Sequence, residues 1–102
     1  RQVRNIEVND AVKGYILAIC RATRDHELIE LGVSPRASQM LLIASSALAL
    51  LSGRSYVIPD DVQALAHDVL DHRIILKPQA RGRGVTDYDV IEEVIKGTVA
   101  PR

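Results

Sequence analysis

The amino-acid sequence predicts an all-α domain of four helices with at most a minimal two-stranded hairpin. Apolar residues recur at helical spacing in four separate stretches, and residues typical of helix boundaries flank these stretches. Only two runs of three residues have the composition of strands. The chain has 102 residues, 47% of them hydrophobic, which is enough for one compact core. We therefore expect a single domain over residues 1–102.

The first predicted helix starts at Asn9 or Asp10, either of which can serve as an N-cap, and runs to about Arg24. Its apolar residues follow spacings of three and four and so share one helix face. They are Val12, Tyr15, Ile16, Ile19, Cys20 and Thr23. Residues 25–32 are predicted to be a connector.

The second predicted helix has the clearest boundaries, with Ser34 at the N-cap, Pro35 at the first helical position and Gly53 just past the end. Further apolar residues lie between those of its main face, so few positions of this helix are clearly polar and solvent-facing. The main face comprises Ala37, Met40, Leu41, Ala44, Ala47, Leu48 and Leu51. We expect this helix to be central and buried on several sides.

The remainder of the chain predicts two more helices and the short strands. Residues 56–58 and 74–76 are the strand candidates, and they could pair with each other. Residues 79–85 contain two glycines and predict a mobile loop. The third helix begins at Pro59-Asp60-Asp61, with the stripe Val62, Leu65, Ala66, Val69 and Leu70. The fourth begins at a Thr86–Asp89 capping box and ends at Gly97, with the stripe Val90, Ile91, Val94 and Ile95.

Charge and aromatic content argue against nucleic-acid binding as a function. Thirteen basic residues balance thirteen acidic ones, so no net field attracts a polyanion. The chain has no Trp, no Phe and three Tyr, whereas single-strand binders rely on aromatic stacking. One short segment, Arg81-Gly82-Arg83-Gly84, resembles Arg-Gly repeats but occurs once.

The composition also argues against a membrane span, a metal site and thiol chemistry. No apolar stretch is long enough to span a bilayer, and residues 1–7 do not lead into a signal-peptide core. The single Cys20 suits a reducing compartment, so we expect a cytoplasmic protein. The three histidines lack ligand spacing and are interpreted as surface or helix-end residues, and Glu92-Glu93 as part of a solvated face.

Arg36 does not suit its position. It follows the Ser34 cap in the first helical turn, where free N–H groups and the helix dipole disfavour a cation by roughly 0.3–1 kcal/mol. Such a helix start is a good place for an anion, above all a phosphate. The alternative interpretation is that Arg36 pairs with Glu30 or another acid.

The segment Gly32-Val33-Ser34-Pro35-Arg36-Ala37 resembles the sensor 2 segment of MoxR-type AAA+ ATPases. The similarity continues along the chain in the family's order and spacing. It includes Tyr15-Ile16, Ala22-Thr23-Arg24, Ala47-Leu48-Ala49, Gly53-Arg54, Tyr56-Val57, Pro59-Asp60-Asp61-Val62, Val69-Leu70 and His72-Arg73-Ile74. Val33 departs from the family, which more often has a small Ala there.

The resemblance implies a C-terminal, four-helix AAA+ lid that closes over ATP held by a separate α/β core. Arg36 corresponds to the sensor 2 arginine that reaches the terminal phosphates, with Ser34 and Pro35 in the same nucleotide-binding segment. Mg²⁺ would be held by the core, and this chain alone would bind no cofactor tightly. Arg24, Arg54 and Arg73 lie in matching segments, and we expect helix-end or structural pairing for them.

The resemblance also implies partners. They are the core domain of the same chain, neighbouring subunits of a homo-oligomeric ring, and a protein bearing a von Willebrand factor A domain. The parent would be a chaperone-like, ATP-hydrolysing enzyme. Because the sequence starts with Arg1 rather than Met, we expect a fragment of that longer ATPase.

A second class of function is a histone-fold-like module that binds protein or DNA. The long second helix, the Gly53-Arg54 turn and the Pro59-Asp60-Asp61-Val62 helix start are compatible with it. The neutral net charge counts against DNA wrapping. A histone fold also has no need for the Ser34-Pro35-Arg36 helix start.

The 102 residues contain no GxxxxGK[ST] phosphate loop and no acidic strand end to hold Mg²⁺. We therefore predict that the purified chain alone shows no ATPase turnover. Phosphate release is the measurement. Turnover that co-purifies with the chain and disappears when its own residues are mutated would contradict the prediction.

Overall fold

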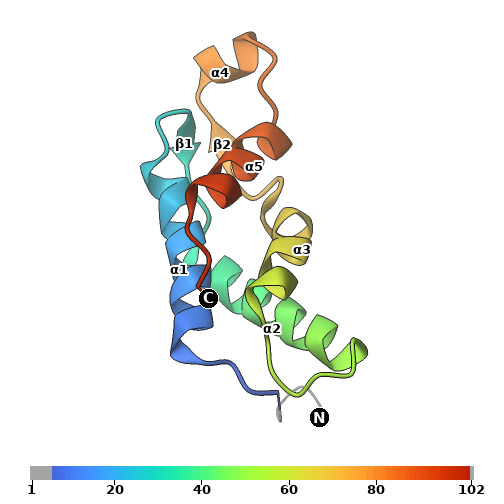
Figure 1. Cartoon of the computed structure of the whole chain (residues 1–102). Helices are drawn as coiled ribbons and strands as arrows, with labels where there is room; N and C mark the ends of the chain where they lie inside the picture. The colour runs from blue at the N-terminus through green and yellow to red at the C-terminus, as the bar shows by residue number, and fades with distance from the viewer. Residues whose placement is uncertain (1–5, 102) are drawn as a thin grey trace.

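A computed structural model describes residues 6–101, and the prediction made for residues 1–7 lies largely outside this range. The fold is mostly helical with one antiparallel strand pair, as the sequence predicts (Figure 1). The elements in order are α1 Asp10–Asp25, β1 Ile29–Leu31, α2 Pro35–Leu51, α3 Pro59–Leu70, β2 Ile75–Leu76, α4 Pro78–Gly82 and α5 Asp87–Gly97. No helix within the described range is both long and apolar enough to cross a membrane.

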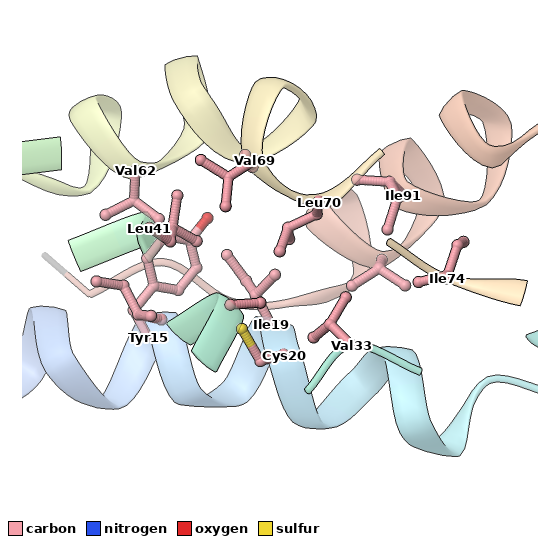
Figure 2. Packing of buried hydrophobic residues seen from close by; sticks show 14 of the residues in the cluster. Tyr15, Ile19, Cys20, Val33, Leu41, Val62, Val69, Leu70, Ile74 and Ile91 are labelled. Atoms are coloured by element: carbon pink, nitrogen blue, oxygen red, sulfur yellow. The ribbon is translucent and has the colours of Figure 1, made fainter. Parts of the chain in front are cut away.

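The core lies between the inward faces of α1, α2, α3 and α5 (Figure 2). In α1 the buried residues are the six of the predicted stripe. Three members of the predicted stripe of α5 are buried, and the fourth, Ile95, is half-buried. Ile19, Leu41, Leu70 and Ile91 come from four different helices and are fully enclosed. Packing these side chains together stabilises helices that would be marginal alone.

Several helix boundaries form as predicted. The side chain of Asn9 accepts a hydrogen bond from the Val12 N–H at 2.8 Å, which caps α1. Thr86 and Asp89 form the predicted capping box of α5, with distances of 3.0 and 3.2 Å. Gly53 has a φ of +80°, a conformation that favours glycine, just after α2.

Three details differ from the sequence-based predictions. The strand β2 pairs with β1 rather than with residues 56–58, with Ile29 opposite Leu76. Residues 55–57 are instead held by Glu7, whose N–H donates to Ser55 and whose carbonyl accepts from Val57. The predicted loop at 79–85 begins with the short helix α4, because Pro78 occupies a first helical position and Ala80 is buried.

Helix α2 is less buried than predicted. It contacts α1 and α3, but Ile43 is 62% exposed and Leu51 is 84% exposed. Leu50 is also exposed, whereas Ser45 and Ser46 lie inside. An almost uniformly apolar helix contains no polar face from which the buried side could be identified, so the prediction of burial on several sides was wrong.

Ion pairs add to the apolar packing where helices and connectors meet. Arg54 forms a bidentate pair with the buried carboxylate of Asp61, at 2.6 and 2.7 Å, and so joins the α2–α3 connector to the start of α3. The hydrogen bonds from Arg54 hold the pKa of Asp61 below its ordinary value. The expected structural pairing of Arg54 is therefore confirmed, and Asp61 is not simply a first-turn charge.

Helix α5 is held on two sides by histidines. His26, just after α1, pairs with Glu93, and His67 on α3 pairs with Glu92 at 2.7 Å. Glu93 is exposed and Glu92 half-buried, as expected of a solvated face, but each also pairs with a histidine outside α5, which the sequence did not indicate. The other ring nitrogen of His67 lies 2.9 Å from Asp71, and its ring stacks on Tyr88. Because carboxylates only accept hydrogen bonds, this arrangement requires both ring nitrogens to carry protons.

We predict that the stability added by His67 is lost as pH rises. Burial alone would lower the pKa of His67, but hydrogen bonds to Glu92 and Asp71 outweigh it and raise the pKa above its ordinary value. A raised pKa stabilises the fold fully below the unfolded value, about 6.5, and the effect disappears above the folded value. Unfolding free energies of wild type and His67→Gln should therefore differ more at pH 5.5 than at pH 8.5.

His26→Gln is the matched control for that measurement. Nδ1 of His26 accepts the Leu28 N–H at 3.0 Å, so a neutral ring with its proton on Nε2 can still donate to Glu93. Its variant removes the other histidine–glutamate contact of α5 and is measured at the same two pH values. An equal stability difference for His67→Gln at pH 5.5 and 8.5 would contradict a charged His67 in the native state.

Candidate functional site

The candidate site is the segment 32–36, which leads from β1 into α2. Ser34 is the N-cap residue of α2 with extended backbone angles, φ −76° and ψ 163°, and Pro35 is the first helical residue. The Ser34 side chain makes no capping hydrogen bond. Of the first-turn residues, Pro35 has no N–H and the Ala37 N–H donates to the Ser34 carbonyl at 3.0 Å, so the N–H of Arg36 is the one left for an anion among these three.

Arg36 lies in the first turn of α2 and is exposed. The alternative interpretation, a pair with Glu30 or another acid, is not seen: within residues 6–101 no carboxylate oxygen lies within 4 Å of its guanidinium. The first turn also contains no acidic residue to offset the charge. The electrostatic mismatch inferred from the sequence therefore persists in the fold.

A surface hollow of about 440 Å³ lies next to this helix start. Residues at the end of α1, in β1 and in the segment before α2 line it, namely Arg24, Glu30, Leu31, Gly32, Val33, Ser34 and Pro35. Arg36 follows this set in sequence and does not line the hollow itself. The lining contains one cation and one carboxylate, so its charge does not by itself select an anion. The prediction of an anion site therefore rests on the helix start and Arg36 rather than on this hollow.

The end of α1 fixes the backbone of this segment. The Val33 N–H donates to Thr23 Oγ1 at 3.1 Å, and Arg24 Nε donates to the Val33 carbonyl at 3.2 Å. Thr23 is fully buried and its hydroxyl donates in turn to the Cys20 carbonyl at 2.6 Å. The Val33 side chain is buried in the same hydrophobic cluster as Ile19 and Cys20, all three of which are labelled in Figure 2. The segment is thus attached through both its backbone and its side chain.

Two of these residues have roles that the sequence analysis did not identify. Thr23 was predicted as a member of an apolar stripe, and its hydroxyl was not considered. A hydroxyl on the buried face of a helix predicts a hydrogen-bonding role, because a buried hydroxyl needs hydrogen-bond partners. Arg24 was expected at a helix end, and its hydrogen bond to Val33 crosses to the following segment. Arg73 is exposed and forms no ion pair in the described part of the chain.

Cys20, whose carbonyl accepts the hydrogen bond from Thr23, is not suited to act as a nucleophile. It is 1% exposed and packs in the core. Burial raises the pKa of the Cys20 thiol, although the neighbouring Ser38 side chain and the charge of Arg24 oppose the shift. A thiol with a raised pKa stays protonated near neutral pH and is inert.

Comparisons with known proteins agree on one family. A family model described as the AAA lid domain matches residues 21–94. An uncharacterised protein, YeaC of Bacillus subtilis, is 43% identical over 99% of this chain and 32% of its own length. Chaperone MoxR1 of Mycobacterium tuberculosis is 35% identical over 93% of this chain and 28% of its own length.

A solved structure shares the fold. The crystal structure of a candidate ATPase from Cytophaga hutchinsonii superposes with a TM-score of 0.93 at 27% identity, over 99% of this chain and 33% of that one. The chain thus spans about a third of the length of each of these proteins. These similarities favour a lid over a histone-fold-like module.

Gly32 provides a test of the contact between this segment and α1. A Cβ atom at Gly32 would lie 2.8 Å from the backbone N and Cα of Arg24, closer than real Cβ contacts. We predict that Gly32→Ala lowers the unfolding free energy by about 1–3 kcal/mol, since backbone has to move.

Gly14→Ala is the matched control, because Gly14 is an exposed residue inside α1 and a Cβ atom added there would meet nothing within 4 Å. It should raise stability by about 0.5–1 kcal/mol through helix propensity. Chemical denaturation of both variants gives the comparison. Equal stabilisation by the two substitutions would show that segment 32–33 does not pack closely on α1.

Proposed function

The chain belongs to the AAA lid domain family, as a lid of the MoxR type, and from this premise we propose that it closes over ATP bound by a separate core domain. In this proposal Arg36 is the sensor 2 arginine and contacts the terminal phosphate. The observation that carries the proposal is an exposed arginine in the first turn of α2 with no carboxylate partner within the described residues. A cation at a helix N-terminus does not stabilise the fold, so binding of an anionic ligand explains its presence better.

The residues present fit a phosphate. The backbone N–H of Arg36 lies in the first turn of α2, and its guanidinium offers forked donors that match phosphate oxygens. Pro35 lacks an N–H but sets the backbone angle of the first turn. Ser34 leaves its hydroxyl out of a capping bond and therefore available to a ligand. These three residues form the nucleotide-binding segment that we propose.

ATP, with Mg²⁺ held by the core, supplies the terminal phosphate that is transferred to water. The contribution of this chain is a fixed positive charge beside that phosphate when the lid closes. Charge that develops on phosphate oxygens in the transition state is stabilised by a donor already in place. The lid therefore affects hydrolysis more than it affects ground-state binding.

The assembly that we propose is a homo-oligomeric ring with a chaperone-like role. One relative carries the name Chaperone MoxR1, and the similarity to this chain covers only 28% of its length. We also retain a von Willebrand factor A domain protein as a proposed partner, on the basis of the family resemblance. The single buried, protonated Cys20 suits a reducing compartment, and the cytoplasm is the location that we propose.

We predict that Arg36→Ala in the full ATPase lowers turnover by up to about 10³-fold, the lower end of the effect of arginines in phosphoryl transfer. Nucleotide affinity should fall less. Removing a cation from a helix N-terminus should leave stability unchanged or raise it by about 0.3 kcal/mol. Turnover, affinity and melting temperature measured side by side test these three expectations.

Arg83→Ala is the matched control, since Arg83 is also exposed but lies outside the hollow and the α2 helix start. It should retain wild-type turnover. If Arg36→Ala turns over ATP at the wild-type rate, or loses activity only because the lid unfolds, Arg36 has no role at the phosphate and the site assignment is wrong.

A further inference from the structure

Helix α2 does not fix its own N-terminus by a side-chain cap. Ser34 holds the N-cap position without a side-chain hydrogen bond, and Pro35 contributes no N–H. The one backbone bond that starts here joins the Ala37 N–H to the Ser34 carbonyl at 3.0 Å, and it is internal to the turn. The position of the first turn therefore depends on the packing of the buried Ala37 side chain and on the contacts made by the residues just before the helix.

Those contacts come from two consecutive residues of α1. Thr23 Oγ1 accepts the Val33 N–H at 3.1 Å, and Arg24 Nε donates to the Val33 carbonyl at 3.2 Å. The two peptide groups that flank Val33 are thus both bonded to the end of α1. The absence of a side chain at Gly32 lets its backbone approach that of Arg24, where a Cβ atom would be 2.8 Å from Arg24 N.

The Thr23 side chain is itself held in place. It is fully buried, and its hydroxyl donates to the Cys20 carbonyl at 2.6 Å, so its one proton is committed and its lone pairs face Val33. Val33 is 2% exposed, so water cannot readily replace the bond to its N–H. Hydrogen bonds thus join Thr23 and Arg24 to Val33, three positions before Arg36.

We propose that Thr23 and Arg24 are positioning residues for Arg36: by bonding both peptide groups of Val33, they set where the first turn of α2 holds its guanidinium. This inference rests on the proposed function of Arg36. A misplacement of about 1 Å in a group that contacts the reacting atoms can cost up to about 100-fold in rate. Loss of the hydrogen bond from Val33 to Thr23, or of that from Arg24 to Val33, would lower turnover by displacing Arg36. Neither Thr23 nor Arg24 needs to contact the nucleotide for this effect.

The test is a double-mutant cycle in the full ATPase, with Thr23→Val and Arg36→Ala made separately and together. Thr23→Val keeps the shape of the side chain and removes its hydroxyl. We expect it to lower kcat by about 10- to 100-fold with a smaller change in KM for ATP, and to have no further effect when Arg36 is already Ala. Thr23→Ser keeps the hydroxyl and should restore most of the activity.

Thr98→Val is the matched control. Thr98 Oγ1 donates to the Val94 carbonyl at 2.8 Å at the end of α5, a similar threonine bond outside the segment before α2. It should leave kcat near the wild-type value. Melting temperatures of all variants show whether any loss of turnover is a loss of folding.

If Thr23→Val does not fold, Arg24→Met decides the question, because Arg24 is exposed and Met keeps most of its length without the donor. It should lower kcat only when Arg36 is present. If the Thr23 or Arg24 variant lowers kcat equally with Arg36 present and with Arg36→Ala, the positioning role is wrong. It is also wrong if neither variant lowers kcat. Both results leave the role of Arg36 itself intact. A wild-type rate for Arg36→Ala would instead overturn the proposed function.

Discussion

The attachment of Val33 to the end of α1 is the constraint on which the rest of the candidate site depends. Its N–H and carbonyl are bonded to Thr23 and Arg24, and its side chain lies in the core. Because α2 begins two residues later, the position of the helix start follows from this attachment. Arg24 and Val33 also line the hollow beside the helix start. Hydrophobic packing and backbone hydrogen bonding thus act together at one point of the chain.

Polar contacts hold the rest of the domain around that point. Arg54 and Asp61 fix the connector between α2 and α3, and histidines join α5 to the other helices at Glu92 and Glu93. Each of these ion pairs joins elements whose apolar faces already pack together. The ion pairs therefore determine how the helices are placed relative to one another more than they add buried surface. A lid that moves as one body over a nucleotide needs such fixed placement, since a loose helix start would not hold a guanidinium at a phosphate.

The helices were predictable from sequence because their signals are local. The stripe of α1 and the Thr86–Asp89 capping box require only neighbouring residues, and both are found. The pairing of β2 with β1 joins residues far apart in the chain, and the ion pair of Asp61 joins α3 to a connector seven residues before it; periodicity within one helix indicates neither contact. For the site, the helix start and the position of Arg36 followed from the sequence. The hydroxyl of Thr23 did not, because its partner lies ten residues away.

The most direct measurement for the central claim is a structure of the full ATPase with a non-hydrolysable ATP analogue. We expect the guanidinium of Arg36 within hydrogen-bond distance, about 2.7–3.1 Å, of a terminal phosphate oxygen. The Val33 N–H should still donate to Thr23. A nucleotide whose terminal phosphate is contacted by core residues alone, with Arg36 directed into solvent, would contradict the account.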